Sequence, residues 1–589
     1  MAAEAPWKPI ALKKQQQRAS RIPEAWRISG VTLDSKHNDL PALVKSCGLL
    51  TDKEFEITQN ATATGLIRDT AQQKVKTIDV VTAFCKRAAI AHQLTNCLTE
   101  IFFDDAIKRA KELDEHMART GKPMGPLHGL PISLKDSYRV KGYDSSLGMA
   151  ILCFKENTFN SVMVDLLLKA GAVLYCKTNL PHTLMALDSD NNIFGRVLNP
   201  AHPRLTAGGS SGGEGALIAM RGSILGIGTD VGGSIRVPAM CNGLYGFKPS
   251  HGRIPYALQE YGVKQGTENM IFRASAGPIA HNIPDCELLF KVVSDMRVWE
   301  MDPEVVPQAW ETQPTLQASP AEPNRLPDRI RIGVVRTDGV STPLPPINKM
   351  MDELVAKFSS HRESTLPVIE MVEMDISPLL SRCQPLANAL FGVFGNNNWL
   401  NMLAEFEEPI IPWLEVRMKR KPRLDIEQVR DLHGARNMLQ IEFLKIWKSD
   451  GGFWTNYKQK TNEVVSLDGI IFPVAPHPTP EINRWNTASY TSSFVLMDYP
   501  AATIPVRKLV PADLKGEINH EQQPIGGWDA ANRKLWDEVD REVYLGTQLS
   551  VQLVGQKLYE RKFLAVMTIL DNIIKAEYAK DKSNIAAQL

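Results

Sequence analysis

Glycine and serine crowd one stretch of the chain at a density that helices and strands do not require. Residues 208–215 have the sequence Gly-Gly-Ser-Ser-Gly-Gly-Glu-Gly, and residues 228–236 have the sequence Gly-Thr-Asp-Val-Gly-Gly-Ser-Ile-Arg. Glycine reaches positive φ and lets main-chain N–H groups come close to a ligand or to a developing negative charge. The stretch therefore predicts two loops that present serines on bare backbone, as an acyl-transfer site needs.

The composition is that of an ordinary globular protein. The 589 residues are 43% hydrophobic and 23% charged, with a formal net charge of +1 at pH 7, which gives no reason to expect nucleic acid as a partner. No run reaches the roughly 18 consecutive apolar residues of a membrane span. Residues 1–18 lack the apolar core of a secretory signal. We therefore expect a cytoplasmic protein without a transmembrane segment.

The eight cysteines are scattered along the chain, with no Cys-x-x-Cys pair and no histidine cluster at metal-ligand spacing. This pattern predicts neither a zinc site nor a disulfide framework. We expect reduced, mostly buried cysteines and a protein that needs no metal or cofactor.

Segments with strand and helix patterns alternate along the chain. This alternation predicts an α/β fold in which helices cover both faces of a large mixed β-sheet. We expect strands at 129–136, 172–176, 329–335, 469–474 and 551–555. Apolar residues recur at helical spacing within 77–120, and further helices are expected at 105–119, 161–170 and 560–579.

Two domains are expected. Residues 1–70 are polar, with short helices at 40–47 and 52–59, and we interpret them as a helical extension that covers the rest of the protein. Residues 71–589 form one catalytic domain. Within it, the proline-rich segment 297–327 is expected to be a surface connector.

A serine needs a base to become a nucleophile. Ser234 follows a Gly-Gly pair whose N–H groups could converge on a carbonyl oxygen, so we predict it as the nucleophile. Lys135 ends an apolar run, and its burial would lower the pKa of its amine towards neutrality, as a general base requires. Three histidines flank other elements and are interpreted as structural or surface residues: His202, His251 and His281.

The chain resembles the amidase signature family in three motifs. They are Gly-Leu-Pro-Ile-Ser-Leu-Lys-Asp at 129–136, Gly-Gly-Ser-Ser-Gly-Gly at 208–213, and the motif at 228–236. The spacing also fits, because Ser210 follows Lys135 by 75 residues and Ser234 follows Ser210 by 24. The resemblance extends over about 70–575 and is nearest to the fungal acetamidase-type branch.

The resemblance implies a Ser-cisSer-Lys triad. Ser234 would attack the acyl carbon, Ser210 would relay the proton, and neutral Lys135 would accept it. Hydrolysis of a small-molecule carboxamide to acid and ammonia or amine would then proceed through an acyl-enzyme, without metal or cofactor, in a homodimer. The implied oxyanion hole consists of the N–H groups of Val231, Gly232, Gly233 and Ser234.

The resemblance also gives supporting roles to Ser211, Asp230 and Arg236, although a structural ion pair explains the last two equally well. Four buried-type residues could line an apolar acyl pocket or pack in the core: Trp485, Tyr490, Phe494 and Met497. The chain departs from related enzymes at His182, where they often have an acidic or amide residue, and at Asp188, where they have Glu.

Other catalytic motifs fit less well. Residues 209–213 match Gly-x-Ser-x-Gly, the nucleophile elbow of α/β-hydrolases with Ser211 as nucleophile, but the segment 199–204, Asn-Pro-Ala-His-Pro-Arg, cannot form the strand that must precede it. A phosphate-binding loop would need Gly-Lys-Ser/Thr, and residues 226–228 lack the third glycine of a dinucleotide site.

Four alternatives remain within the family. They are a fatty-acid amide hydrolase, a carbamate or ester hydrolase, the glutaminase subunit of a tRNA-dependent amidotransferase, and an inactive binding protein on the same scaffold. The lipid enzyme should show a membrane-binding apolar element, and the glutaminase should copurify with partner subunits. An inactive protein should have a broken triad, whereas all three residues stand in this chain.

Overall fold

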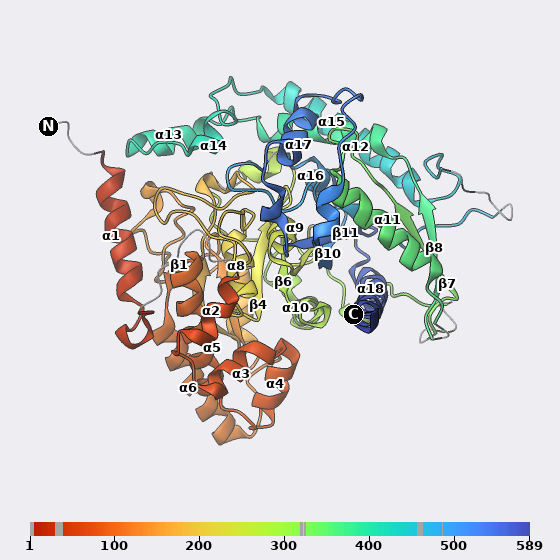
Figure 1. Cartoon of the computed structure of the whole chain (residues 1–589). Coiled ribbons are helices and arrows are strands. Elements are labelled where there is room, and N and C mark those ends of the chain that lie inside the picture. Colours follow the sequence, from red (N-terminus) through yellow and green to blue (C-terminus); the bar gives the residue numbers. More distant parts are fainter. Residues whose placement is uncertain are drawn as a thin grey trace.

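A single large β-sheet organises the computed structural model of the chain (Figure 1). The structure describes residues 5–588 without 30–38, 265, 319–321, 323–324, 364, 456, 458–462 and 486, and only the backbone within 581–588. The sheet has 11 strands in the order β1-β3-β2-β4-β6-β5-β10-β11-β9-β7-β8. Helices lie on both of its faces, which confirms the predicted α/β fold.

The strands are both parallel and antiparallel. β2 pairs in parallel with β3 and β4, and β7 with β8 and β9, whereas the pairs that join these two groups are antiparallel. The strands are β1 (Leu98–Ile101), β2 (Pro131–Lys135), β3 (Val173–Thr178), β4 (Leu225–Asp230), β5 (Tyr245–Lys248), β6 (Ser275–Ala280), β7 (Arg329–Val334), β8 (Val368–Glu373), β9 (Gly469–Pro473), β10 (Ala501–Lys508) and β11 (Gln548–Val554).

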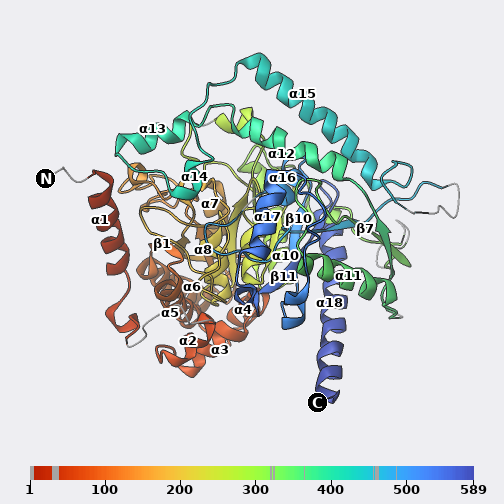
Figure 2. The same cartoon turned by 45° about the horizontal axis from the view of Figure 1, so that its top comes forward.

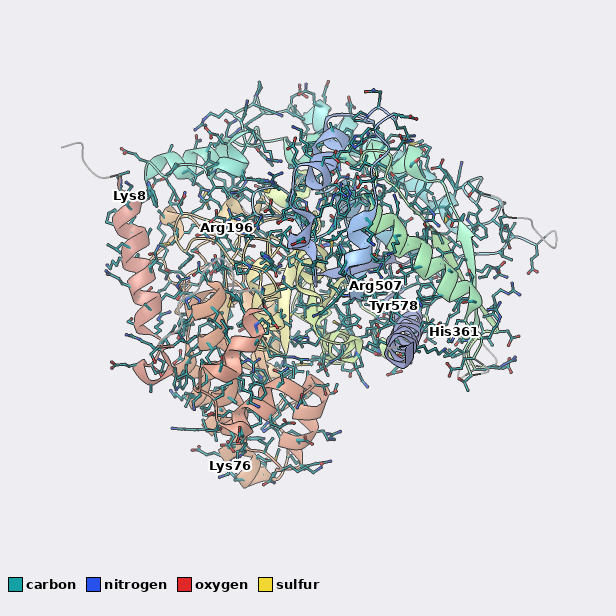
Figure 3. The ribbon with its side chains drawn as sticks, viewed as in Figure 1. Lys8, Lys76, Arg196, His361, Arg507 and Tyr578 are labelled. Carbon is teal, nitrogen blue, oxygen red and sulfur yellow. The ribbon has the colours of Figure 1, made fainter. Side chains whose placement is uncertain are left out.

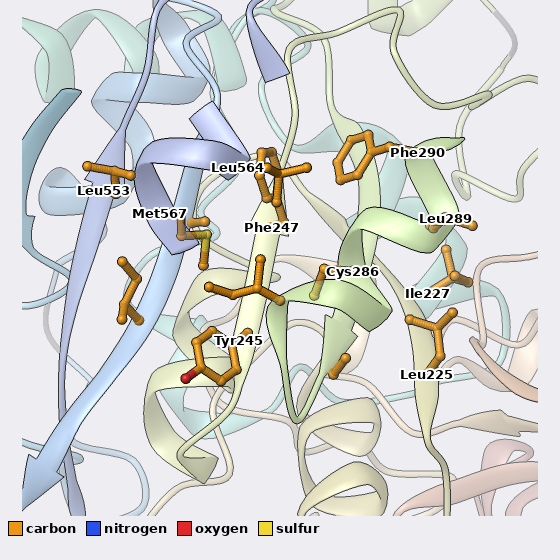
Figure 4. Packing of buried hydrophobic residues seen from close by; sticks show 14 of the residues in the cluster. Leu225, Ile227, Tyr245, Phe247, Cys286, Leu289, Phe290, Leu553, Leu564 and Met567 are labelled. Atoms are coloured by element: carbon orange, nitrogen blue, oxygen red, sulfur yellow. The ribbon is translucent and has the colours of Figure 1, made fainter. Parts of the chain in front are cut away.

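One face of the sheet is covered by α10 (Ile283–Asp295), α11 (Pro345–Ser360) and α18 (Glu560–Gln588). Figure 4 shows strand residues such as Leu225 and Phe247 packed against side chains of α10 and α18. Phe247 makes edge contacts with two rings, Phe290 on α10 and Phe563 on α18, at 4.7 Å between ring centroids in each case.

The opposite face is covered by α8 (Gly212–Ala219), α9 (Arg236–Asn242), α12 (Ser377–Phe391) and α16 (Ser489–Leu496). Strand β9 shows the alternation: Ile471 belongs to the core of the first face, whereas Ile470 and Phe472 belong to the core of the second. Because both faces are covered, the central strands β2, β3, β4, β5, β6 and β9 are buried along their whole length.

The N-terminal segment is helical and lies along one edge of the molecule (Figures 1 and 2). It contains α1 (Trp7–Ser20), α2 (Leu40–Ser46), α3 (Asp52–Asn60) and α4 (Ala63–Ala71), followed by α5 (Thr77–Thr95) and α6 (Phe103–Thr120). The helices expected at 40–47 and 52–59 are found to within one residue. Lys14 on α1 is buried and contacts the carboxylates of Glu100 and Asp144.

The proline-rich segment 297–327 runs past α10 with two short 3-10 turns, Val298–Glu300 and Trp310–Thr312. It is anchored by buried apolar side chains, among them Trp310, which stacks on Phe290 with 6.1 Å between ring centroids. The remaining helices are α7 (Val162–Lys169), α13 (Asn397–Glu405), α14 (Pro412–Glu415), α15 (Ile426–Phe443) and α17 (Gly527–Asp537).

Helix α18 is tied to α11 by polar side chains, which Figure 3 shows near Arg507, Tyr578 and His361. Glu353 on α11 accepts hydrogen bonds from Arg507 at 2.7 Å and from the Tyr578 hydroxyl at 3.2 Å. Within the described part of the chain, none of the helices has the length and apolar character needed to cross a bilayer.

Candidate active site

The predicted triad residues come from three segments that the parallel strands bring together. Lys135 is the last residue of β2, and Ser234 lies in the loop that follows the neighbouring parallel strand β4. Carboxyl ends of adjacent parallel strands meet at the same edge of a sheet, where α/β proteins place their sites. Ser210 lies in the loop that leads into α8, and its peptide bond to Gly209 is cis.

Lys135 is fully buried and contacts two hydroxyl groups. Its Nζ is 2.6 Å from Ser210 Oγ and 2.8 Å from Thr229 Oγ1. Burial lowers the pKa of Lys135 to about 7, although the carboxylates of Asp230 and Glu214 act in the opposite direction. An amine with this pKa is partly neutral near pH 7 and can accept a proton.

Glu214, for which the sequence predicted no role, is buried and acts on the charge of Lys135. It accepts hydrogen bonds from Ser133 Oγ at 2.6 Å and Thr178 Oγ1 at 2.9 Å, and burial raises its pKa to about 7. A Cβ at Gly226 would lie 2.0 Å from its Oε2, so glycine makes the space for this carboxyl group. One signal was available in the sequence: Glu214 is the single charged residue in the otherwise apolar segment of α8.

Asp230 organises the loop of Ser234. Its carboxylate accepts the N–H groups of Gly233 at 2.7 Å and Ile235 at 3.2 Å and forms an ion pair with Arg236 at 3.0 Å. Burial alone would raise the pKa of Asp230, but Arg236 holds it below its usual value. Both side chains are buried. This geometry is that of a structural ion pair, which the sequence offered as the alternative to a supporting catalytic role.

Arg236 extends this network to distant parts of the chain. It donates to Gln552 Oε1 on β11 and to the carbonyl of Thr491 on α16, both at 2.9 Å. Thr491 Oγ1 in turn donates to the carbonyl of Gly232 at 2.5 Å. The Ser234 loop is therefore held by β11 and α16 as well as by its own carboxylate.

The four N–H groups predicted as oxyanion donors are not equivalent. The N–H group of Gly233 donates a hydrogen bond to the carboxylate of Asp230. Those of Val231, Gly232 and Ser234 have no hydrogen-bond acceptor among the described residues. Ser211 joins the two serine loops, because its N–H donates to the carbonyl of Ser234 at 3.2 Å.

Two cavities meet at Ser234. The smaller, of about 160 Å³, is also lined by Ser210 and Thr229. The larger, of about 440 Å³, is also lined by Gly232 and by Trp485. Of the four residues suggested for an acyl pocket, Trp485 thus borders a cavity next to Ser234.

The other three suggested pocket residues lie elsewhere. Tyr490 and Phe494 pack in the core against Phe472, whose ring stacks on Tyr490 with 4.8 Å between centroids. Met497 borders a separate groove beneath α15. Their sequence separation from Trp485 is short, but α16 turns Tyr490 and Phe494 towards the sheet, and Met497 follows the end of this helix.

His182 and Asp188, the two departures from related sequences, each have a partner. His182 Nε2 lies 3.1 Å from Glu408 Oε1, and both side chains are buried. Asp188 pairs with Arg196 at 2.6 Å. The described residues contain no group of three or more His, Cys, Asp or Glu side chains that could hold a metal ion.

Comparison with solved structures defines the class of protein. The structure superposes on a fatty acid amide hydrolase with a TM-score of 0.81 and 28% identity, covering 96% of this chain and 95% of that one. It also shares its fold with a bacterial aryl acylamidase of the amidase signature enzymes, with a TM-score of 0.62, 18% identity, and coverage of 87% and 96%. The fold is that of the amidase signature enzymes.

The profile of the Amidase family matches residues 79–564, and the chain belongs to this family. It is 35% identical over 576 residues to an acetamidase of Aspergillus oryzae, which covers 97% of this chain and 99% of the relative. An acetamidase of Emericella nidulans is 34% identical, with coverage of 95% and 97%. The predicted resemblance is confirmed, and the protein is an amidohydrolase that acts on amides.

Proposed function

We propose that the protein hydrolyses a linear carboxamide to a carboxylic acid and ammonia or amine through an acyl-enzyme on Ser234. The observation that carries this proposal is the 2.6 Å contact between Lys135 Nζ and Ser210 Oγ, in a cavity that Ser234 shares with Ser210. Burial lowers the pKa of Lys135 to about 7, which supports its role as the base.

In the proposed first half-reaction, Ser234 Oγ bonds to the carbonyl carbon. Its proton passes to Ser210, whose own proton passes to neutral Lys135. The N–H groups of Val231, Gly232 and Ser234 stabilise the oxyanion, whereas Gly233 provides the turn. Lys135 then returns the proton through Ser210 to the leaving nitrogen as the C–N bond breaks. In the second half-reaction water hydrolyses the acyl-enzyme by the same relay.

The substrate is proposed to be a small linear amide, because relatives of nearly full length are acetamidases. Esters and carbamates pass through the same tetrahedral intermediate and are expected as secondary substrates. The likeness to a fatty acid amide hydrolase makes a long-chain acyl amide the second candidate. A panel of acetamide, benzamide, a long-chain acyl amide and glutamine separates these classes.

The test combines turnover with covalent labelling. Ser234→Ala and Lys135→Ala should each lower kcat by about four orders of magnitude, since nucleophile and base act as a unit. A fluorophosphonate probe should add mass to the peptide that contains Ser234 in the wild-type protein and not in Ser234→Ala. Full turnover by Ser234→Ala would exclude the mechanism.

We also propose a homodimer, from the family resemblance, and a cytoplasmic location. Light scattering coupled to size-exclusion chromatography measures the oligomeric state, and imaging of a fluorescent fusion measures the compartment. A monomeric mass or a membrane-bound fusion would contradict these two proposals without affecting the proposed chemistry.

A further inference from the structure

The two cavities that meet at Ser234 differ in which catalytic groups they border. The smaller cavity is lined by Ser210 together with Ser234. The larger cavity is lined by Val231, Gly232 and Ser234, and Ser210 is not among the described residues that line it. A substrate amide bound at Ser234 therefore has two non-equivalent directions in which to extend.

The proton relay distinguishes these directions. In the proposed mechanism the leaving nitrogen receives its proton from Ser210, so this nitrogen must face the cavity that Ser210 lines. The oxyanion occupies the donors of the Ser234 loop. The remaining substituent of the carbonyl carbon, the acyl part, then extends into the larger cavity.

The wall of the larger cavity combines aromatic rings with cations. Trp413 and Trp485 provide flat apolar surfaces, and Arg417 and Lys421 provide the charges. The other polar residues among its described lining are neutral amides and hydroxyls, with no Asp or Glu. The cavity is therefore electropositive.

The two cations belong to a basic segment that follows α14. Residues 417–423 have the sequence Arg-Met-Lys-Arg-Lys-Pro-Arg, which places five cations in seven residues. Both side chains are exposed to solvent where they line the cavity, and no carboxylate of the described residues forms an ion pair with Arg417 or Lys421.

Arg417 is nevertheless held in a fixed position. Its guanidinium group stacks on the ring of Trp413 at 3.9 Å from the centroid, and its Nη1 donates to the Trp413 carbonyl at 2.9 Å. A cation that is positioned without an acidic partner, at the wall of a substrate cavity, can bind a carboxylate of the ligand.

We infer that the preferred substrates are amides whose acyl part carries a distal carboxylate, which Arg417 and Lys421 bind in the larger cavity. Half-amides of dicarboxylic acids have this chemistry. The inference rests on the proposed function, because the direction of the acyl part follows from the roles of Ser234 and Ser210.

The test compares a charged substrate with its neutral isostere. The probes are adipic acid monoamide and the amide in which an isopropyl group replaces its carboxylate. The wild-type protein should have a kcat/KM at least about tenfold higher for the monoamide, mainly through a lower KM, and added salt should reduce this preference. The double variant R417Q/K421Q should bring the ratio close to one.

Lys419→Gln is the matched control, because Lys419 is an exposed cation of the same segment that does not line the cavity. It should keep the wild-type ratio. An equal loss in Lys419→Gln would overturn the assignment of the contact to Arg417 and Lys421, and a wild-type ratio near one would overturn the inference itself. Thermal unfolding of all variants checks that each is folded.

A second compound tests which part of the substrate, acyl or amine, extends into the larger cavity. Acetyl-β-alanine carries its carboxylate on the amine side of the amide. If R417Q/K421Q impairs hydrolysis of this compound and not that of adipic acid monoamide, the acyl assignment is wrong. Failure of the proposed function is distinguishable, because it appears as turnover retained in Ser234→Ala, whatever the substrate ratio.

Discussion

At the scale of single residues, the proposed mechanism depends on a lysine that is partly neutral near pH 7 because it is buried. Burial lowers the pKa of Lys135 to about 7, and only the unprotonated amine can accept a proton from Ser210. We therefore expect kcat/KM to rise about tenfold per pH unit below pH 7 and to level off above it. A pH–rate profile measures this. A plateau that extends to pH 5 would contradict the assignment.

The charge of Glu214 should affect the pH at which the acid limb of this pH–rate profile lies. Because its pKa is about 7, Glu214 is partly ionised near neutral pH, and the ionised form favours the protonated form of Lys135, so removal of the charge should lower the pKa of the amine further. Glu214→Gln keeps the shape of the side chain and should move the acid limb of the pH–rate profile to lower pH. An unchanged limb would show that the carboxyl group is uncharged throughout this range.

Gly233 and Gly232 are adjacent glycines with different requirements. Gly233 has φ of +127°, and a Cβ there would lie 2.3 Å from Thr491 Oγ1, which is held by the Gly232 carbonyl. Gly233→Ala should therefore destabilise the fold by about 2 kcal/mol or more. A Cβ at Gly232 would meet no atom within 4 Å, so Gly232→Ala should keep the wild-type Tm in the same thermal unfolding experiment.

Residue-level prediction from sequence was possible where chemistry was concentrated in motifs. The motifs identified Lys135, Ser210 and Ser234, and the structure brings the first two within hydrogen-bond distance. Thr229 and Glu214 were missed as partners of the lysine. Their contacts depend on the pairing of β2 with β4 and on the packing of α8 against these strands, which local sequence patterns do not encode.

At the scale of elements, strands β2, β3, β7, β9 and β11 were predicted because each is a short segment rich in apolar residues between helical patterns. Strand β4 was not predicted, because two of its six residues are glycines, which usually weaken strands. Gly226 is nevertheless required there, since it leaves room for Glu214. Gly226, one of the two glycines that argued against a strand here, is thus explained by the buried carboxyl group of Glu214.

Helix α1 is attached to the body of the protein in part through one buried charge. Lys14 Nζ lies 2.6 Å from Asp144 and also contacts Glu100, and all three side chains are about 2% exposed. Lys14→Ala would leave buried Asp144 without its ion-pair partner and Glu100 with Arg21 alone, and should cost about 3 kcal/mol, seen as a lower Tm. Lys8→Ala is the control, since Lys8 is exposed on the same helix (Figure 3). Equal Tm values for the two variants would contradict this role of Lys14.

At the scale of the whole molecule, the site is assembled from distant parts of one sheet. Lys135 and Ser234 come from the N-terminal half of the chain. Arg236, close to Ser234, donates to the carbonyl of Thr491 and to the amide of Gln552, which follow Arg236 by 255 and 316 residues. Because β10 and β11 insert between β5 and β9, the C-terminal strands contact α9 (Arg236–Asn242), the helix that directly follows the Ser234 loop. Sequence motifs alone could not predict this dependence.

Gln552 is the residue that tests this long-range support. Besides accepting from Arg236, its Nε2 donates to the carbonyls of Pro473 and Tyr490 at 2.9 and 2.8 Å. Gln552→Leu preserves the volume but leaves these buried groups without partners, so we expect a loss of about 2–4 kcal/mol in stability and at least a tenfold lower kcat at temperatures where the protein is folded.

Gln548→Leu on the same strand is the matched control, because Gln548 is only partly buried and bonds the carbonyl of its neighbour Leu549. It should have nearly wild-type kcat and Tm. If Gln552→Leu lowers Tm while kcat stays at the wild-type value, β11 stabilises the sheet without positioning Ser234. A joint loss of both, reproduced by Arg236→Met, would mean that the catalytic loop takes its geometry from the far end of the chain.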